Sequence, residues 1–270
     1  IKRGMKIMNS RNWILLKELV KTDFKLRYQG SVMGHLWSIL KPIMLFSVMY
    51  MVFIHFLRFG DGIPHFAVAL LLGMVIWTFF QETTVMGLTS IVARGDLLRK
   101  LSFPKEIIVV AVSVNAFINF LINLVVVLIF ALINGVDVSK YALLVPLLLV
   151  ELYVFSLGVA FLLATLFVRF RDISPIWEVA MQAGMYATPI IYPISMVSEK
   201  SLIAAKIMML NPLAQIIQDI RFMLISDQNV IVGQLLSWKF VYIPYVIPFV
   251  VFAIGYTVFK HNSKRFEKNN

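Results

Sequence analysis

Long uninterrupted blocks of apolar residues constrain this chain more than any other feature of its sequence. A helix needs about 20 residues to cross a hydrocarbon core of about 30 Å, and six blocks reach or approach that length. Backbone N–H and C=O groups inside lipid must be satisfied within the protein, so such blocks form helices. We therefore predict an all-α, polytopic membrane protein with six transmembrane helices. The six blocks are 40–57, 66–88, 107–133, 142–168, 176–191 and 240–259.

Composition excludes several other classes of protein. Of 270 residues, 60% are hydrophobic and 14% are charged, whereas soluble domains contain about 45–50% apolar and about 25% charged residues. A water-bounded fold, a disordered chain and a coiled coil are therefore excluded, and a chain without cysteine is not a disulfide scaffold. The net charge of +11 is compatible with nucleic acid, but the basic residues flank apolar blocks. This placement is typical of loops that face anionic headgroups, so we expect contact with membrane lipid and no nucleic-acid partner.

The distribution of basic residues predicts the orientation of the chain. Lys and Arg number 18 in the N-terminal segment, the second-to-third and fourth-to-fifth connections and the tail, against 6 in the opposite connections. Cytoplasmic loops carry the excess of Lys and Arg, so both termini should be cytoplasmic. We divide the chain into a cytoplasmic N-terminal segment with an amphipathic interface helix (1–36), a six-span transmembrane domain (37–260) and a cytoplasmic tail (261–270).

The segment 13–28 has the pattern of an amphipathic helix ahead of the first span. Its apolar residues cover one half of a helical wheel, and Lys17, Lys21 and Lys25 lie on the other half. Such a helix is expected to lie in the cytoplasmic interface. Asp23 and Arg27 fall inside the apolar half at i, i+4 spacing, so either they pair with each other or they mark a contact with a protein partner.

The stretch 93–104 predicts a short helix between two long ones. Gly95 permits a tight turn, Asp96 is expected to cap the amides that follow it, and Pro104 suits the first turn of the next span. A short helix at the ends of two spans would transmit force to both. The alternative is a connecting loop without such a role.

Asn115, Asn119 and Asn123 recur every four residues in the third apolar block and therefore share one helix face. Amides in hydrocarbon are costly without partners. This face should meet other helices through hydrogen bonds or line a polar passage.

Four ionisable residues lie in or near the predicted spans. Lys41 and Glu82 are expected near the interfaces, where a long side chain reaches the headgroups at low cost. Glu151 and Glu178 are harder to place, and buried charge favours a functional role. The four do not form the carboxylate relay that a proton-coupled transporter would need.

Two further segments, 200–210 and 212–225, are apolar on one side but too short to cross the membrane. Segments of about 10 to 14 residues are typically re-entrant or interfacial. They would form a lid over an exit on the outer side, or an interfacial hairpin without a gating role.

Catalytic signatures are missing from the sequence. Gly-Lys occurs nowhere, so there is no phosphate-binding P-loop. The four histidines lack metal-ligand spacing, and no Gly-x-Ser-x-Gly is present. We therefore expect neither an enzyme nor a metal or cofactor site in this chain, and a separate subunit with ATP and Mg²⁺ would have to supply energy for uphill transport.

Several segments together resemble the membrane subunit of bacterial type-2 ABC exporters for cell-surface polysaccharide, the O-antigen, capsule and teichoic-acid group. Each motif is weak alone, and their order along most of the chain carries the resemblance. The motifs are Arg27-Tyr-Gln-Gly-Ser-Val-Met-Gly-His-Leu-Trp37 with Lys41-Pro42, Leu101-Ser-Phe-Pro-Lys-Glu-Ile107, Arg171-Asp172, Thr188-Pro-Ile-Ile-Tyr-Pro193, and Asn211-Pro212 with Arg221.

The resemblance implies a homodimer in the bacterial cytoplasmic membrane that binds two ATP-binding cassette subunits and moves a lipid-linked glycan between its protomers. The N-terminal helix and the segment after Ala93 would contact the ATPase, and the outer helices would gate the exit. The implied ATPase contacts are Asp23, Arg27, Arg94, Gly95, Asp96, Leu97, Leu98, Arg99 and Lys100.

Sugars stack on aromatic rings and need hydrogen-bond partners. The predicted passage residues are therefore Tyr50, Trp77 and Tyr186 with Asn115, Asn119 and Asn123. A permease of the same fold that exports a drug or a lipid is the alternative within transport. An intramembrane acyltransferase would need a converging catalytic constellation, and an ion channel a filter-like repeat; neither is found.

Overall fold

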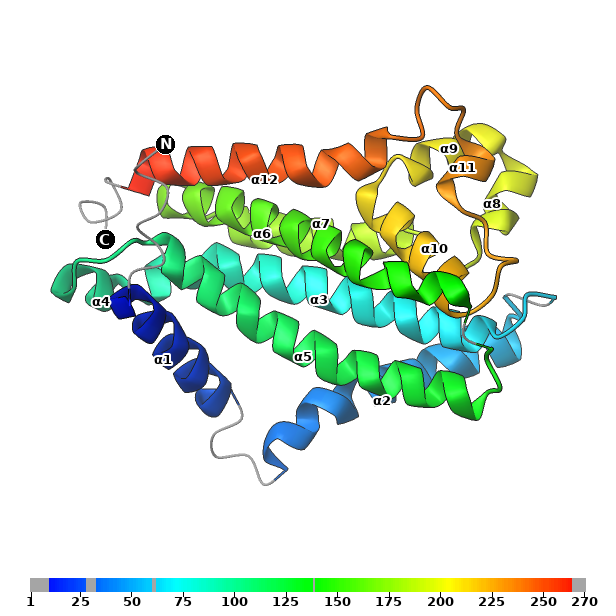
Figure 1. Ribbon diagram of the computed structural model, residues 1–270, viewed down its shortest axis with the longest axis horizontal. Helices are drawn as coiled ribbons and strands as arrows, with labels where there is room; N and C mark the ends of the chain where they lie inside the picture. The colour runs from blue at the N-terminus through cyan, green and yellow to red at the C-terminus, as the bar shows by residue number, and fades with distance from the viewer. Residues whose placement is uncertain (1–9, 28–32, 60–61, 138, 264–270) are drawn as a thin grey trace.

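The computed structural model describes residues 10–27, 33–59, 62–137 and 139–263. Every regular element in these ranges is a helix, as the long apolar blocks predict. Four long helices run along the longest axis of the molecule (Figure 1). They are α3 (Phe66–Ala93), α5 (Glu106–Ile133), α6 (Val145–Arg169), which follows the 3₁₀ turn η4 (Lys140–Leu144), and α12 (Ile243–Asn262).

Helix α3 is the centre of the bundle. It packs against α5 and α6, and α6 packs against α12. Most of the α3 side chains are buried, from Phe66 at its start to Ile91 near its end. Its rings contact those of its neighbours: Phe80 stacks on Phe155 of α6 with ring centroids 5.4 Å apart. An all-round apolar helix of this kind is expected in the interior of a bundle.

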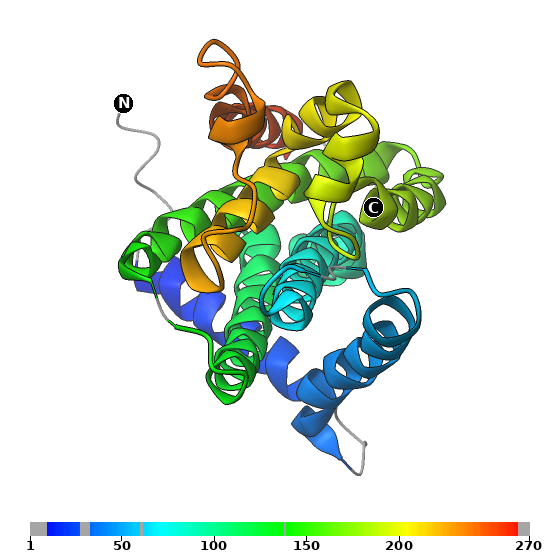
Figure 2. The same cartoon turned by 90° about the vertical axis from the view of Figure 1, so that its right-hand side faces the viewer.

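A fifth long helix stands to one side of the bundle. α2 (Trp37–Met49) continues into η3 (Tyr50–Phe56), which is seven residues of π-helix. Figure 2 shows α2 and the N-terminal helix α1 (Ser10–Leu26) on the side of the bundle opposite α12. None of the α1 side chains is fully buried, and α1 packs against α5. The amphipathic helix predicted for 13–28 is therefore present, shifted slightly toward the N-terminus.

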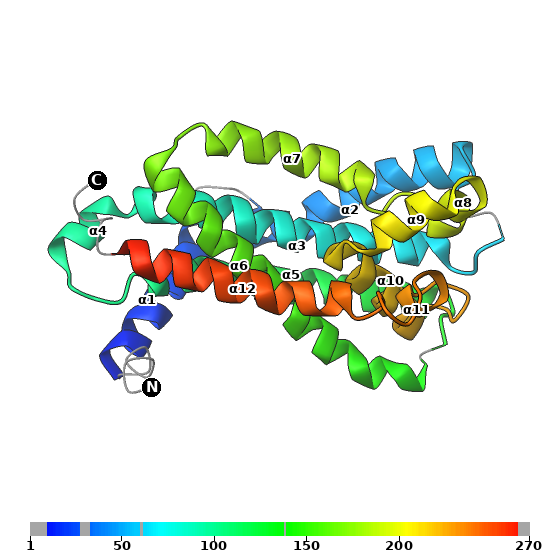
Figure 3. The ribbon, with the colours of Figure 1, turned by 90° about the horizontal axis from the view of Figure 1, so that it is seen from above.

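Five helical stretches among the described residues are long and apolar enough to cross a membrane: 37–56, 66–93, 106–133, 140–169 and 243–262. The sixth expected span, 176–191, corresponds to α7 (Ile173–Ala187), which has 15 residues and a length of about 22 Å. Helix α7 ends before Thr188 because Pro189 disfavours the helical conformation in the residue before it. Figure 3 shows α7 running beside α3 and α6; its crossing of the membrane stays a prediction.

The two ends of the bundle differ in character. α4 (Gly95–Lys100), the turn between α6 and α7, and the end of α12 lie at one end (Figures 1 and 3). The short helices gather at the other end. They are α8 (Ile194–Lys200), α9 (Leu202–Met209), α10 (Pro212–Leu224) and α11 (Val232–Leu235). The basic connections predicted to be cytoplasmic are thus grouped at one end, and the predicted outer helices at the other.

Helices α6 and α12 approach each other through glycines. A Cβ atom built on Gly158 would lie 2.5 Å from Phe252 Cα, and one built on Gly255 would lie 2.2 Å from the Gly158 carbonyl oxygen. Small residues allow this kind of backbone contact between membrane helices. The position of α12 on the bundle therefore depends on these two glycines.

Candidate functional site: a polar groove between α1, α2, α3 and α5

A groove separates α1 and α2 from α3 and α5. It consists of two adjoining hollows of about 430 and 650 Å³, and Arg27 and Met86 line both. Many of the side chains that line the groove are polar. These are Asp23, Arg27, Ser38, Lys41, Thr78, Gln81, Glu82, Thr89, Ser90, Arg94, Asn115, Asn119 and Asn123.

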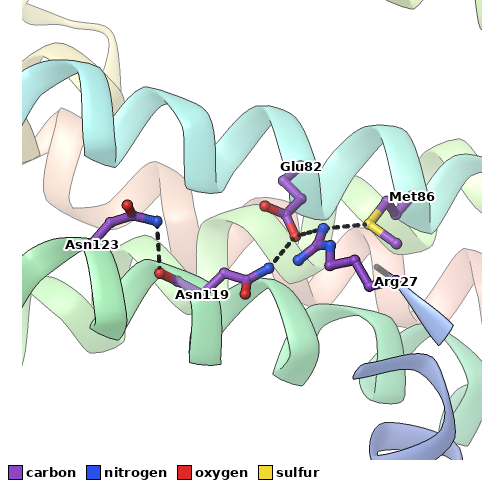
Figure 4. A network of polar contacts seen from close by, with 5 residues as sticks. All are labelled: Arg27, Glu82, Met86, Asn119 and Asn123. Carbon is purple, nitrogen blue, oxygen red and sulfur yellow. Dashed lines mark hydrogen bonds and ion pairs between the residues drawn. The ribbon is translucent and has the colours of Figure 1, made fainter. Parts of the chain in front are cut away.

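Glu82 is the centre of a hydrogen-bonded network in this groove (Figure 4). Arg27 Nη2 donates to Glu82 Oε1 and lies 3.5 Å from Met86 Sδ. Asn119 Nδ2 donates to the same carboxylate oxygen over 3.1 Å, and Asn123 Nδ2 donates to the backbone carbonyl oxygen of Asn119 over 2.9 Å. One end of α1 is thus joined to α3, and α3 to the asparagine face of α5.

The ion pairs of α1 differ from the expected ones. Asp23 and Arg27 do not pair with each other: Arg27 pairs with Glu82, and Asp23 pairs with Arg94 at the junction of α3 and α4. The side chains of these four residues are only 17–24% exposed. They therefore fasten α1 to the bundle within one chain, and the expected role of Asp23, Arg27 and Arg94 at an ATPase interface remains a prediction.

Glu82 lies well inside α3, and its expected position near a membrane interface stays a prediction. It precedes the last residue of α3 by eleven positions, about 16 Å along the helix, and its side chain is 19% exposed. Its carboxylate is stabilised by Arg27 and Asn119 instead of by water. The asparagine spacing indicated a polar face, but the sequence contained no signal that Glu82 was its partner.

Three buried polar groups in or beside the groove keep hydrogen-bonding capacity. Neither amide atom of Asn115 has a partner among the described residues, and the same holds for Asn119 Oδ1 and Arg94 Nη1. Buried polar groups are costly unless they are bonded. These atoms therefore favour a polar ligand or water in the groove.

Lys41 and Trp37 line the larger hollow from α2. They are four residues apart and so share a helix face, and both are exposed. The groove thus presents a cation and a flat aromatic ring on the side opposite the asparagines. This combination suits a ligand with hydroxyl groups and apolar C–H faces.

The three predicted aromatic passage residues lie elsewhere. Trp77 is buried, and its ring packs so close to α7 that a Cβ on Gly184 would lie 2.8 Å from Trp77 Cη2. Tyr50 and Tyr186 are exposed, and the Tyr186 carbonyl accepts a hydrogen bond from Tyr192 Oη over 2.6 Å. Of the six predicted passage residues, the structure brings together only Asn115, Asn119 and Asn123 in the groove.

Helix α4 presents a charged face at the end of the bundle. Asp96, Arg99 and Lys100 are exposed, Leu97 is half-buried, and Gly95 and Leu98 pack inward. The expected capping by Asp96 is wrong: α4 begins at Gly95 without a side-chain cap, and Asp96 accepts a hydrogen bond from Arg99 Nη2 over 2.9 Å. Asp96 lies in the first helical turn, where a carboxylate interacts favourably with the helix dipole. The exposed side chains of α4 are therefore the charged ones.

Arg221 joins two sequence motifs at the end of the bundle that carries α8 to α11. It is fully buried, and it donates to the carbonyl oxygens of Ala69, Pro189 and Ile190 over 3.0, 2.7 and 2.8 Å. Burial lowers the pKa of its guanidinium, and the three carbonyl oxygens accept hydrogen bonds from its N–H groups. Asn211 Nδ2 lies 3.3 Å from Thr188 Oγ1, which ties the start of α10 to the same turn. The motif 188–193 and the motif that contains Asn211 and Arg221 are therefore held together beside the start of α3.

Comparison with known proteins gives a consistent result. Residues 14–225 match the family described as ABC-2 type transporter. The chain is 27% identical over 253 residues to an O-antigen export system permease protein RfbA of Klebsiella pneumoniae, with 93% of each chain covered. It is 30% identical over 203 residues to the RfbA permease of Myxococcus xanthus, covering 75% of this chain and 76% of the relative. With the helical fold and the apolar spans, these matches show that the chain belongs to the membrane family of ABC-2 type transporters.

Proposed function

We propose that this chain is the transmembrane subunit of an ATP-driven exporter that moves a lipid-linked polysaccharide across the bacterial cytoplasmic membrane. The observation that carries this proposal is the similarity to O-antigen export permeases, which covers 93% of this chain and 93% of the relatives. Membership of the ABC-2 family implies pairing with an ATP-binding subunit. A homodimer of this chain completes the proposed assembly.

The chemistry of the polar groove favours an amphiphilic substrate. Its asparagines, Glu82, Arg27 and Lys41 offer hydrogen bonds and positive charge to a polar head, while the surrounding helices offer apolar surface to a lipid tail. Hydrogen bonds between these side chains and a polar head are stronger in a medium of low dielectric constant than in water. The unpartnered amide of Asn115 adds donors and acceptors for hydroxyl groups. We therefore place the polar head of the substrate in this groove during export.

The exposed charges of α4 provide the proposed contact with the ATPase. Closure of the nucleotide-bound ATPase pair would push on Asp96, Arg99 and Lys100 and thereby move the adjoining ends of α3 and α5. Energy enters as a shift between two conformations of the dimer, because nucleotide binding favours one of them. No catalytic step is assigned to this chain.

Deletion of the gene in its host tests the proposal. Surface polysaccharide should disappear and lipid-linked glycan should accumulate inside the cell, and the wild-type gene should restore both. A partner ATPase that binds but cannot hydrolyse ATP should give the same defect. Intact surface glycan in the deletion strain would refute the proposal and favour export of a drug or a lipid, the second candidate that the fold allows.

A further inference from the structure

Two buried carboxyl groups meet at the outer end of the bundle, away from the groove. Glu151 comes from α6, Asp219 and Gln215 from α10, and Tyr245 from α12. Tyr245 Oη donates to Asp219 Oδ2 over 2.6 Å, and Gln215 Nε2 donates to the same oxygen over 3.0 Å. The backbone N–H of Val232 also hydrogen-bonds to Asp219. Glu151, Gln215 and Asp219 are only 6%, 0% and 4% exposed.

The hydrogen bonds of this cluster are unevenly distributed. Tyr245, Gln215 and the Val232 backbone all donate to Asp219, and only the Gln215 amide also donates toward the Glu151 carboxyl group. Glu151 Oε1 and Gln215 Oε1 are buried without a partner among the described residues. An ionised glutamate and an amide oxygen are both acceptors only. With Glu151 ionised, the cluster therefore contains two unsatisfied acceptors beside a second carboxylate, an arrangement with a high cost in a dry interior.

Among the described residues, the nearby basic side chains do not form ion pairs with the two carboxyl groups. Arg221, on the same helix as Asp219, donates to carbonyls on another side of α10. Lys140 of η4 is exposed and lies 5.3 Å from the centroid of the Tyr141 ring. Asp219 is the ionisable side chain whose charge acts on Glu151, and the charge of Glu151 in turn acts on Tyr245 of α12. Burial raises the pKa of Asp219, and its hydrogen bonds from Tyr245 and Gln215 oppose that rise.

We propose that Glu151, Gln215, Asp219 and Tyr245 form a buried protonation site that holds one proton on Glu151 while Asp219 stays ionised. The proton comes from water. It converts the Glu151 carboxylate, an acceptor, into a carboxylic acid with an O–H donor, and the Gln215 Oε1 atom is an acceptor that has no donor. Because the site joins α10 to α6 and α12, the bound proton stabilises the packing of an outer helix against two long helices. Loss of the proton leaves adjacent carboxylates that repel each other and loosens α10.

The melting temperature of the full-length protein in detergent tests the site across pH. Wild type should lose stability from mildly acidic to alkaline pH, because deprotonation of Glu151 separates the helices. Glu151→Gln carries a permanent amide donor in nearly the same shape, so its melting temperature should not follow this dependence. Asp219→Asn places an amide donor among three donors and should lower the melting temperature at every pH. Glu178→Gln, an exposed carboxyl on α7, is the control and should keep the wild-type pH profile.

Infrared spectroscopy gives a readout that does not depend on a mutant being stable. Wild-type protein at neutral pH should show the C=O stretch of a protonated carboxylic acid, which disappears at alkaline pH and is missing in Glu151→Gln. Absence of this band in wild type, or a wild-type pH profile in Glu151→Gln, would overturn the proposal. A melting temperature that rises with sodium concentration at fixed pH, relative to a large organic cation, would also overturn it in favour of a metal-cation site.

Discussion

Replacing Gly255 with alanine should disrupt the packing of α12 on α6. The added Cβ would lie 2.2 Å from the Gly158 carbonyl oxygen, 3.1 Å from its carbonyl carbon and 3.3 Å from Leu162 Cγ. Ordinary contacts begin at 3.4 Å, so the helices must separate by about 1 Å at this point. Backbone atoms cannot rotate away as a flexible side chain could. The clash can therefore be removed only if a whole helix moves.

The expected cost follows from that movement. Overpacking a well-packed interior costs about 1–3 kcal/mol, and a radial gap of about 0.5–1 Å forfeits a quarter to a half of the dispersion energy of each affected contact. Because the contact at Gly255 is with backbone, we expect the upper end, about 3 kcal/mol. For a chain of this size, about 2–4 °C of melting temperature correspond to 1 kcal/mol, so Gly255→Ala should melt about 6–12 °C below wild type.

Thermal unfolding of the full-length protein in detergent, followed by circular dichroism, measures this difference. Gly233→Ala is the matched control, since a Cβ at Gly233 meets no atom within 4 Å and should change the melting temperature little. Gly158→Ala should resemble Gly255→Ala, and the double mutant should cost less than the sum of the two because the same helices separate. A Gly255→Ala protein with the melting temperature of wild type would refute the close approach of α6 and α12.

Three further predictions concern α1 and α4. Arg27→Ala removes the cationic partner of a largely buried carboxylate, with a cost of about 1–2 kcal/mol after allowance for solvent screening. Surface-glycan measurement should show reduced export, whereas Lys25→Ala, which removes an exposed cation in the last turn of α1, should export normally. Asp23→Arg should weaken the attachment of α1 by opposing Arg94, and adding Arg94→Asp should restore the melting temperature; failure of this rescue would contradict the pair. Asp96→Lys should uncouple ATP hydrolysis from export with normal membrane insertion, and wild-type export rates would count against the coupling role of α4.

Part of the groove was predictable from the sequence, and part was not. The four-residue spacing of Asn115, Asn119 and Asn123 is a local property of one helix, and the structure confirms that the three share a polar face. The partner of Asn119 is Glu82, 37 positions away, and no local pattern contains that information. The aromatic residues did not predict the lining of the groove. Rings such as Trp77 also pack well between helices, so aromatic character alone does not distinguish a buried core residue from a groove residue.

The sequence by itself determined the elements of this protein: apolar length fixed the long helices, amphipathic periodicity the N-terminal helix, and proline with short apolar runs the outer helices. These features depend on residues within a few turns of one another and on the need to satisfy the backbone in lipid. Only the tertiary structure decided which polar groups meet, because Arg27 pairs with Glu82 across 55 positions and Arg221 donates to the Ala69 backbone carbonyl across 152. Such contacts follow from the rotation and crossing of packed helices, which side-chain shape sets over the whole bundle.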